Sequence, residues 1–106
     1  MADVGYDAII VGGGPAGLSA AITAALRGMK VLVLEGGSFG GLLASLYPQK
    51  LVLNYPGLPE GVNAKTISDN LIAQTRGLGV EMRNERVLKI TKDRKVKTFK
   101  KKAEIF

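Results

Sequence analysis

Three glycines and one glutamate have the types and spacing that could support chemistry in this chain. Gly12, Gly14 and Gly17 form the pattern G-x-G-x-x-G, and Glu35 follows the last of them by 18 residues. After a strand, the first glycine permits a tight turn, the second lets the main chain approach a diphosphate, and the third lets helix and strand pack closely. The helix N-terminus offers free N–H groups and partial positive charge to that diphosphate. The pattern predicts a dinucleotide site, and a glycine turn without a ligand is the alternative.

Glu35 is placed to bind the sugar of such a dinucleotide. A carboxylate about 20 residues beyond the glycines can accept hydrogen bonds from the ribose hydroxyls of an adenosine. The same charge repels a 2′-phosphate, which disfavours NADP at this site. A surface salt bridge is the alternative role for Glu35.

The elements that must position these residues are predicted from apolar runs and turn residues. Residues 7–11 (DAIIV) have the continuous apolar run of a parallel strand that is buried on both faces. Pro15 favours a helix that begins near Gly14 and continues to Leu26. The inward face of this helix is predicted to carry Leu18, Ala21, Ile22, Ala25 and Leu26.

A second strand is predicted to complete a βαβ unit. Gly28 is placed to end the helix in a left-handed conformation. Residues 30–34 (KVLVL) then predict another buried strand, with Glu35 at its end.

The periodicity disappears after this unit. Residues 36–61 are rich in Gly, Pro, Asn and Tyr, and we expect a connection without regular structure that is functional or wraps a ligand. Asn63 can cap a helix over 64–76, with an inward stripe of Ile67, Leu71, Ile72 and Leu78. Residues 80–90 predict one strand, and the remainder predicts the start of a hairpin or meander with its turn at Asp93-Arg94.

Composition excludes several kinds of site. The 106 residues fit one small domain, and they include no Cys and no His. Disulfides, a redox dithiol and thiolate or imidazole ligands are therefore excluded within the chain, and we expect no metal site. The apolar runs are too short to span a bilayer, and the N-terminus lacks the layout of a signal peptide. We expect a cytoplasmic location and no membrane partner.

The charge of the chain is distributed unevenly. The net charge is +6, with −1 through Met82 and +7 from Arg83 onward. The tract Lys100-Lys101-Lys102 could contact nucleic acid or an acidic partner. A solvated strand and turn is the favoured interpretation, because the aromatic and glycine pattern of an RNA-binding surface does not accompany the charge. We therefore expect no nucleic-acid partner.

Over nearly its whole length, the chain resembles the N-terminal FAD-binding segment of the thioredoxin reductase family, within the pyridine nucleotide-disulfide oxidoreductase superfamily. The family includes thioredoxin reductase-like ferredoxin–NADP reductases. The resemblance is carried by YDAIIVGGGPAG through LVLE, then by FGGLL and by YPQKLVLNYPGLPEG. FGGLL followed by NYPG is more specific than the glycine pattern, which many flavin and nicotinamide enzymes share.

The resemblance implies FAD as the cofactor and a set of contacts to it. Its diphosphate is expected at the glycine turn, its ribose at Glu35, and its flavin half beside the following loop. Asn54 matches the Asn of the family's N-[YFW]-P-G turn, and Val87 matches the position whose main chain meets the adenine, with plain strand packing as the alternative. The implied cofactor-binding residues are Gly12, Gly14, Pro15, Ala16, Gly17, Glu35, Gly36, Gly40, Gly41, Leu42, Asn54 and Val87.

The chain departs from the family in its loop and in its length. Leu42 stands where the family often has Gln, so one side-chain hydrogen bond to the cofactor is expected to be missing. Tyr47 resembles the ferredoxin reductase branch, whereas Asn54-Tyr55-Pro56-Gly57 resembles thioredoxin reductases. Either tyrosine could stack near the flavin, although an aromatic in an apolar loop more often belongs to the core. Family members are longer, with an NADPH domain, a CxxC pair in true thioredoxin reductases, and a C-terminal return that completes the FAD domain.

The expected fold class is α/β: a partial Rossmann-like FAD/NAD(P)-binding domain with a parallel sheet and the start of a β-meander. Residues 1–106 are interpreted as the FAD-binding segment, without the NADPH domain and the C-terminal return. The implied function is electron transfer from NADPH through FAD to a disulfide or to a thioredoxin- or ferredoxin-like redox protein, and a homodimer is left open. A non-catalytic FAD- or ADP-binding module is the alternative. No residue is assigned as a catalytic acid, base or nucleophile.

Overall fold

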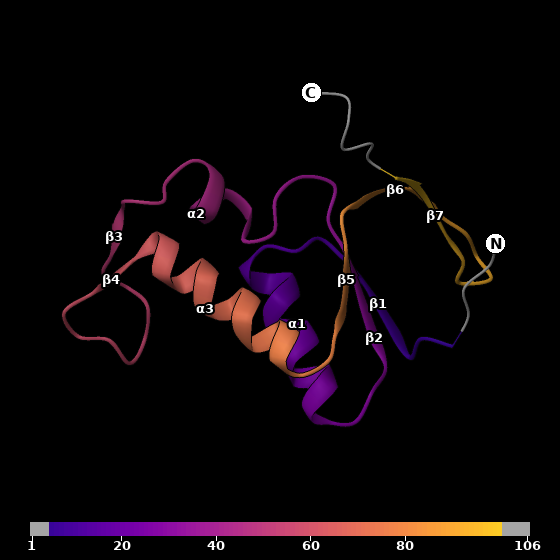
Figure 1. The fold of residues 1–106 in the computed structure, drawn as a ribbon, viewed down its shortest axis with the longest axis horizontal. Coiled ribbons are helices and arrows are strands. Elements are labelled where there is room, and N and C mark those ends of the chain that lie inside the picture. Colours follow the sequence, from indigo (N-terminus) through magenta and orange to yellow (C-terminus); the bar gives the residue numbers. More distant parts are fainter. Residues whose placement is uncertain (1–4, 101–106) are drawn as a thin grey trace.

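A three-stranded parallel sheet of order β1-β2-β5 forms the centre of the fold (Figure 1). The structure is a computed structural model, and it describes residues 5–100. The strands are β1 (Ala8–Val11), β2 (Val31–Leu34) and β5 (Glu81–Arg83). Val11 pairs with Leu34, and Leu34 pairs with Arg83, so the carboxyl ends of the strands meet at one edge of the sheet. The predicted α/β class with a parallel sheet is confirmed.

The two outer strands of this sheet differ from the central one in burial. All residues of β2 are buried, as its continuous apolar run predicts. The prediction that residues 7–11 are buried on both faces is wrong, because β1 is an edge strand of the described sheet and Val11 is 52% exposed. Burial of a strand depends on neighbours that its own sequence does not reveal.

Helix α1 (Pro15–Leu26) packs against β1 and β2, and α3 (Ala64–Gly77) lies beside α1. The core contains Ala21 of α1 together with Val31 and Val33 of β2, because a small residue lets the helix approach the sheet. Gly28 has φ +83°, which confirms the left-handed end of α1. The Asn63 Oδ1 atom accepts a hydrogen bond from Lys65 N at 2.9 Å, which confirms the predicted cap of α3.

Two leucines predicted on the inward faces of these helices are exposed instead. Leu26 is the last residue of α1 and Leu78 is the C-cap of α3, and both side chains reach solvent. The helical period identified the correct face, but it did not reveal that side chains at the two helix ends remain exposed.

The prediction that residues 36–61 form a connection without regular structure is wrong. This segment contains α2 (Gly41–Ser45), which packs against α3, and β3 (Leu51–Val52), which pairs antiparallel with β4 (Val62–Asn63). These elements are too short to produce a periodic hydrophobic pattern, which is why the sequence did not reveal them. Tyr47 and Tyr55 are exposed here and are not core residues.

The strand predicted over 80–90 is divided at Asn84. Its first part is β5 of the parallel sheet, and its second part is β6 (Glu85–Ile90), which pairs antiparallel with β7 (Val96–Lys100). The predicted turn is confirmed, since Arg94 has φ +64° and Thr91 N donates to Lys95 O at 2.9 Å. Lys101, Lys102 and the final KAEIF stretch lie outside the described residues.

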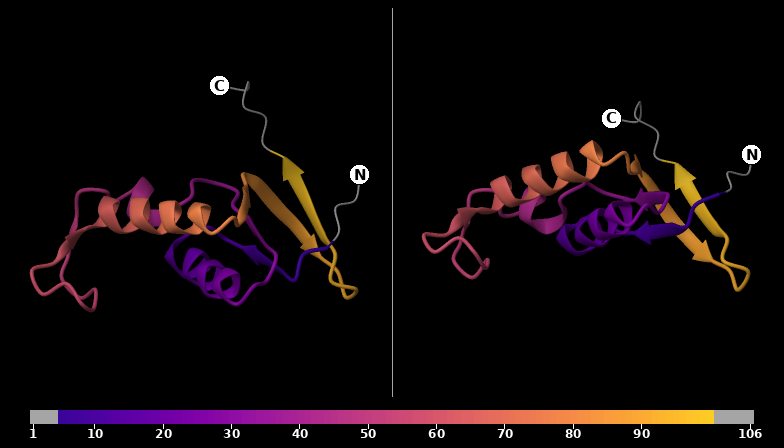
Figure 2. Two further views of the ribbon diagram at one scale, coloured as in Figure 1. Left: turned by 60° about the horizontal axis from the view of Figure 1, so that its bottom comes forward. Right: turned by 90° about the horizontal axis from the view of Figure 1, so that it is seen from below.

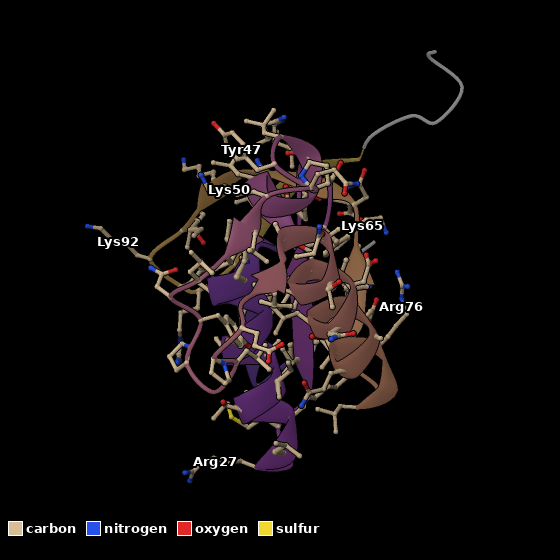
Figure 3. All side chains as sticks on the ribbon, turned by 90° about the vertical axis from the view of Figure 1, so that its left-hand side faces the viewer. Arg27, Tyr47, Lys50, Lys65, Arg76 and Lys92 are labelled. Atoms are coloured by element: carbon tan, nitrogen blue, oxygen red, sulfur yellow. The ribbon has the colours of Figure 1, made fainter. Side chains whose placement is uncertain are left out.

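The β3–β4 pair and the β6–β7 hairpin lie at opposite ends of the long axis, with the sheet and α1 between them (Figures 1 and 2). Arg27, Arg76 and Lys92 project from different sides of the body and do not gather on one face (Figure 3). Within residues 5–100 there is no helix whose length and apolar character would suffice to cross a membrane. In the same range, no cluster of acidic side chains is suited to hold a metal ion.

Candidate dinucleotide-binding site

The turn between β1 and α1 is built from glycines that the backbone geometry requires. Gly12 has φ +109°, and its N–H donates to Leu34 O at 2.8 Å, which fixes the turn to the end of β2. A Cβ atom on Gly17 would lie 1.9 Å from Gly12 O, closer than any real side chain can approach. The tight turn and the close helix packing predicted for these two glycines are therefore present.

Helix α1 presents main-chain donors at this turn. Its first hydrogen bond runs from Leu18 N to Gly14 O at 2.9 Å, and no side chain caps the helix. The N–H groups of Ala16 and Gly17 have no acceptor among residues 5–100. A Cβ on Gly14 would meet only Gly41 Cα, at 3.7 Å. Free donors beside a glycine without a side chain form a cradle that suits a diphosphate.

The carboxylate of Glu35 joins the two loops at the carboxyl end of the sheet. Its Oε1 atom accepts from Gly13 N and its Oε2 atom accepts from Gly37 N, both at 2.7 Å. Each carboxylate oxygen can accept a further hydrogen bond, so both remain able to bind ribose hydroxyls. No cation of the described chain lies within salt-bridge distance of Glu35, which argues against the surface salt bridge.

A second glycine segment lies directly against the first. Gly40 N donates to Gly13 O at 2.8 Å, and a Cβ on Gly41 would lie 3.0 Å from Gly14 Cα. The buried hydroxyl of Ser68 on α3 donates to Gly40 O at 3.3 Å and holds this segment from behind. The structure therefore brings together Gly12 to Gly17, Glu35, Gly40 and Gly41, as the site prediction requires.

Three predicted site residues lie apart from this cluster. Leu42 follows it in α2 and is 65% exposed. Asn54 is an exposed residue of the loop between β3 and β4, and Val87 is a half-buried residue of β6. The elements that carry Asn54 and Val87 lie on opposite sides of the glycine turn along the long axis (Figure 1).

Three residues that the site prediction did not include also shape the site. A Cβ on Gly13 would lie 2.5 Å from Phe39 Cδ1, so Phe39 covers the glycine turn. Asn84 Nδ2 donates to Glu35 O at 2.9 Å and also to Gly37 O, and Arg86 lies against Gly36. The only local signal for Asn84 was an amide residue within an otherwise strand-like run.

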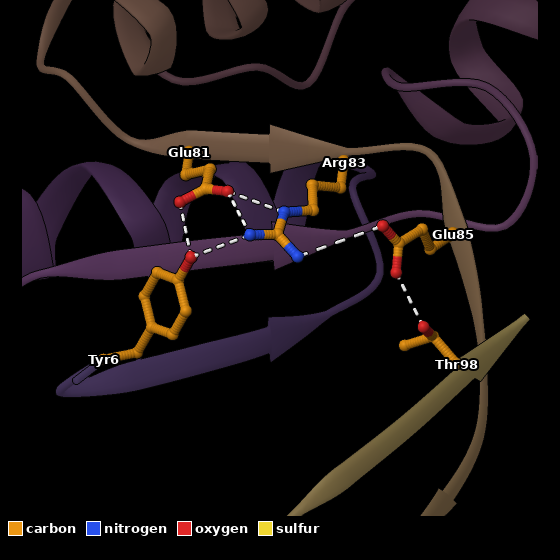
Figure 4. A network of polar contacts seen from close by, with 5 residues as sticks. All are labelled: Tyr6, Glu81, Arg83, Glu85 and Thr98. Atoms are coloured by element: carbon orange, nitrogen blue, oxygen red, sulfur yellow. Dashed lines mark hydrogen bonds and ion pairs between the residues drawn. The ribbon is translucent and has the colours of Figure 1, made fainter. Parts of the chain in front are cut away.

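A polar network fastens the β6–β7 hairpin to the sheet (Figure 4). Arg83 on β5 binds Glu81 Oε2 through Nε at 2.6 Å and Tyr6 Oη at 3.1 Å, and the hydroxyl of Tyr6 also donates to Glu81. Arg83 and Glu85 lie 4.0 Å apart, and Thr98 of β7 donates to Glu85 at 2.6 Å. The start of β6 is thereby held in a fixed position relative to β5.

A βαβ unit with a glycine turn facing an acidic residue at the end of the second strand defines a dinucleotide-binding protein of the Rossmann type. Residues 6–105 match the sequence model of the pyridine nucleotide-disulphide oxidoreductases, and the chain belongs to this family.

Relatives and solved structures agree with this assignment. The chain is 42% identical over 102 residues to a ferredoxin–NADP reductase of Streptococcus thermophilus, covering 95% of this chain and 29% of that protein. It is 39% identical over 95 residues to ferredoxin–NADP reductase 2 of Shouchella clausii, covering 89% of this chain and 28% of that protein.

Thioredoxin reductases are among the similar solved structures. That of Lactococcus lactis has a TM-score of 0.76 and 34% identity, covering 89% of this chain and 31% of that chain. That of T. acidophilum has a TM-score of 0.73 and 31% identity, covering 88% and 30%. The resemblance to the thioredoxin reductase family is confirmed, and the chain spans about three-tenths of the length of the curated relatives it matches.

Proposed function

We propose that the chain forms the FAD-binding part of a flavin-dependent oxidoreductase in which electrons pass from NADPH through FAD to a disulfide or a small redox protein. The observation that carries the proposal is the Glu35 carboxylate, which holds Gly13 and Gly37 at 2.7 Å beside the open N-terminus of α1. This arrangement supplies donors for a diphosphate and an acceptor for a ribose within one short stretch of the sheet edge.

The residues present fit FAD. The glycine-lined cradle at Gly14 and Gly41 leaves room for the diphosphate, and Glu35 is suited to the ribose. Asn54 is proposed to orient the flavin half, and Val87 is proposed to meet the adenine. Their elements lie on either side of the cradle, which suits an extended ligand (Figure 1). FAD supplies the hydride and electron chemistry when bound, while the chain binds and orients it.

The remaining parts of the reaction are assigned to a longer protein. We propose that an NADPH domain and a further part of the FAD domain lie outside residues 1–106, since the chain spans only 29% of the Streptococcus thermophilus relative. The electron acceptor is proposed to be a ferredoxin- or thioredoxin-like protein, because the similar proteins include a ferredoxin–NADP reductase and a thioredoxin reductase. The proposal also includes a cytoplasmic location and no nucleic-acid or membrane partner. It is compatible with a homodimer.

The competing function is that of a non-catalytic FAD- or ADP-binding module. The purified chain is mixed with FAD and passed over a gel-filtration column, and the flavin absorbance of the protein peak is recorded. NADPH is then added without oxygen, and bleaching of the flavin is followed.

A yellow protein peak that NADPH alone does not bleach is the result expected of the binding module, and it is also compatible with the reductase proposal, which assigns the nicotinamide site to a part of the protein outside this chain. Bleaching would place the nicotinamide site inside this chain and overturn the proposal that the NADPH domain lies outside residues 1–106. A colourless peak, together with no binding of ADP in a calorimetric titration, would overturn the dinucleotide site itself. A full-length relative that bleaches with NADPH while its Gly14→Val equivalent does not would separate the reductase from the simple binding module.

A further inference from the structure

Arg86 of β6 lies directly against Gly36, the residue that follows the ribose-binding glutamate. A Cβ placed on Gly36 would lie 3.3 Å from both the Cβ and the Cζ atoms of Arg86, and 3.4 Å from its Cα atom. Both the main chain and the guanidinium group of Arg86 therefore lie close to Gly36. A side chain at position 36 would require Arg86 to shift by a few tenths of an ångström.

The position of Arg86 is fixed by the contacts of the two residues that precede it. Asn84 donates to the carbonyl oxygens of Glu35 and Gly37, which ties the start of β6 to the turn that contains Gly36. The Thr98 hydroxyl donates to Glu85 Oε1 at 2.6 Å, and Glu85 Oε2 lies 4.0 Å from Arg83 Nη1 (Figure 4). Since the residues before it are anchored, Arg86 is presented to Gly36 by a firmly held strand.

The guanidinium of Arg86 has no protein partner in the part of the chain that the structure describes. It forms no ion pair or hydrogen bond with residues 5–100, although Glu35 is the residue just before Gly36. The side chain is exposed, so its position over Gly36 is not explained by burial. A planar cation held at the end of a nucleotide site without a carboxylate partner is available to a ligand.

We propose that Arg86 binds the base of the bound nucleotide by stacking its guanidinium plane on the adenine ring. The proposal rests on the proposed function, because it follows from the diphosphate at the glycine turn and the ribose at Glu35. The base then extends from the ribose on the side away from the diphosphate, where Gly36 and Arg86 meet. Guanidinium groups stack well on aromatic faces, and Glu35 disfavours the alternative of an additional phosphate on the ribose.

The β6–β7 hairpin provides a matched control for charge. Arg86 pairs across the hairpin with residue 99, and Lys97 is two residues earlier on β7, so Arg86 and Lys97 share a face. Lys97 is exposed and is not among the atoms nearest to Gly36. Removing either side chain removes one positive charge from this face, but only Arg86 is expected to contact the base.

The test is a titration of the isotope-labelled chain with ADP, with FAD and with inorganic pyrophosphate, followed by NMR. We expect ADP, and not pyrophosphate, to shift the Gly36 amide and the Arg86 Nε–H signals. Arg86→Ala is expected to weaken ADP and FAD binding about tenfold while leaving pyrophosphate binding unchanged. Arg86→Lys is expected to restore little of this loss, because it returns the charge without the plane. Lys97→Ala is expected to bind ADP as the unsubstituted chain does.

The outcomes separate this proposal from the proposed function. Unchanged ADP affinity in Arg86→Ala, or full recovery in Arg86→Lys, would overturn the stacking role and leave the dinucleotide site intact. Binding of 2′,5′-ADP that is tighter than that of ADP and lost in Arg86→Ala would show that Arg86 receives a phosphate instead. No binding of FAD or ADP by the unsubstituted chain would overturn both proposals. Dispersed amide spectra of all variants establish that the fold is retained.

Discussion

The two halves of the candidate site differ in how completely the chain builds them. At the glycine turn, hydrogen bonds from the N–H groups of Gly12, Gly13 and Gly40 fix the main chain without any ligand. From α2 to the β3–β4 loop, large apolar side chains remain exposed instead, and these are Leu42, Leu46, Tyr47, Leu51, Leu53, Tyr55 and Leu58. The chain completes one end of the site and leaves an apolar surface at the other.

This difference indicates which half of a dinucleotide the chain can bind by itself. A diphosphate and a ribose need donors and acceptors in fixed positions, and under the proposed function the main chain and Glu35 supply them. An apolar ring system needs apolar surface that is covered on both sides, and exposed leucines and tyrosines provide at most one side. We therefore expect substitutions at the glycine turn to have large effects, and those from α2 to β4 to have small ones.

Among substitutions at the glycine turn, the largest effect on stability is expected for Gly17→Ala. The new Cβ would lie 1.9 Å from Gly12 O, so α1 must move away from β1, at a cost of about 3 kcal/mol in the free energy of unfolding. Urea unfolding followed by circular dichroism measures this loss. The matched control is Gly77→Ala in α3, where a Cβ meets nothing within 4 Å, and which is expected to stabilise the chain by about 0.5–1 kcal/mol. Equal effects of the two substitutions would contradict the close packing at Gly17.

Gly14→Val is expected to abolish nucleotide binding with a smaller effect on stability. Gly14 has φ −81° and ψ −171°, an extended conformation that valine adopts readily, but the branched side chain would fill the space assigned to the diphosphate. ADP affinity is expected to fall by orders of magnitude in calorimetry. Gly14→Ala is the folding control, because its Cβ would be in ordinary contact with Gly41 Cα at 3.7 Å. Undiminished ADP binding by a folded Gly14→Val chain would refute the assignment of this turn.

Glu35→Ala is expected to have an intermediate effect on both properties. Loss of the carboxylate removes the proposed ribose acceptor, at an expected cost of about 1.5–3 kcal/mol in ADP binding. It also leaves the N–H groups of Gly13 and Gly37 without their acceptor, so the free energy of unfolding is expected to fall by about 1–3 kcal/mol. Glu60 is an exposed loop carboxylate, and Glu60→Ala is expected to change neither ADP affinity in calorimetry nor the free energy of unfolding in urea. A loss of binding without any loss of stability would mean that Glu35 does not hold the two loops together.

The glycine-turn half was predictable from the sequence, and the other half was not, for a physical reason. Gly12, Pro15, Gly28 and the apolar run of β2 act through local conformation and burial, so their sequence is sufficient to locate β1, α1 and β2. Asn84 divides β5 from β6 through a contact with Glu35, which is 49 residues away. The edge position of β1 and the short elements α2 and β3 likewise depend on partners that are distant in sequence or absent from the local pattern.

Leu53→Ala is expected to have the smallest effect on the isolated chain. Leu53 is 71% exposed, so its truncation removes little buried apolar surface. We therefore expect a change of less than about 0.5 kcal/mol in the free energy of unfolding. Leu18→Ala removes the same atoms from a fully buried position of α1 and is expected to cost about 2–5 kcal/mol. The ratio of the two losses, measured by urea unfolding, tests whether the chain builds its two ends unequally. A large loss at Leu53 would show that the apolar end contributes to the stability of the chain by itself, and the contrast between the two halves would fail.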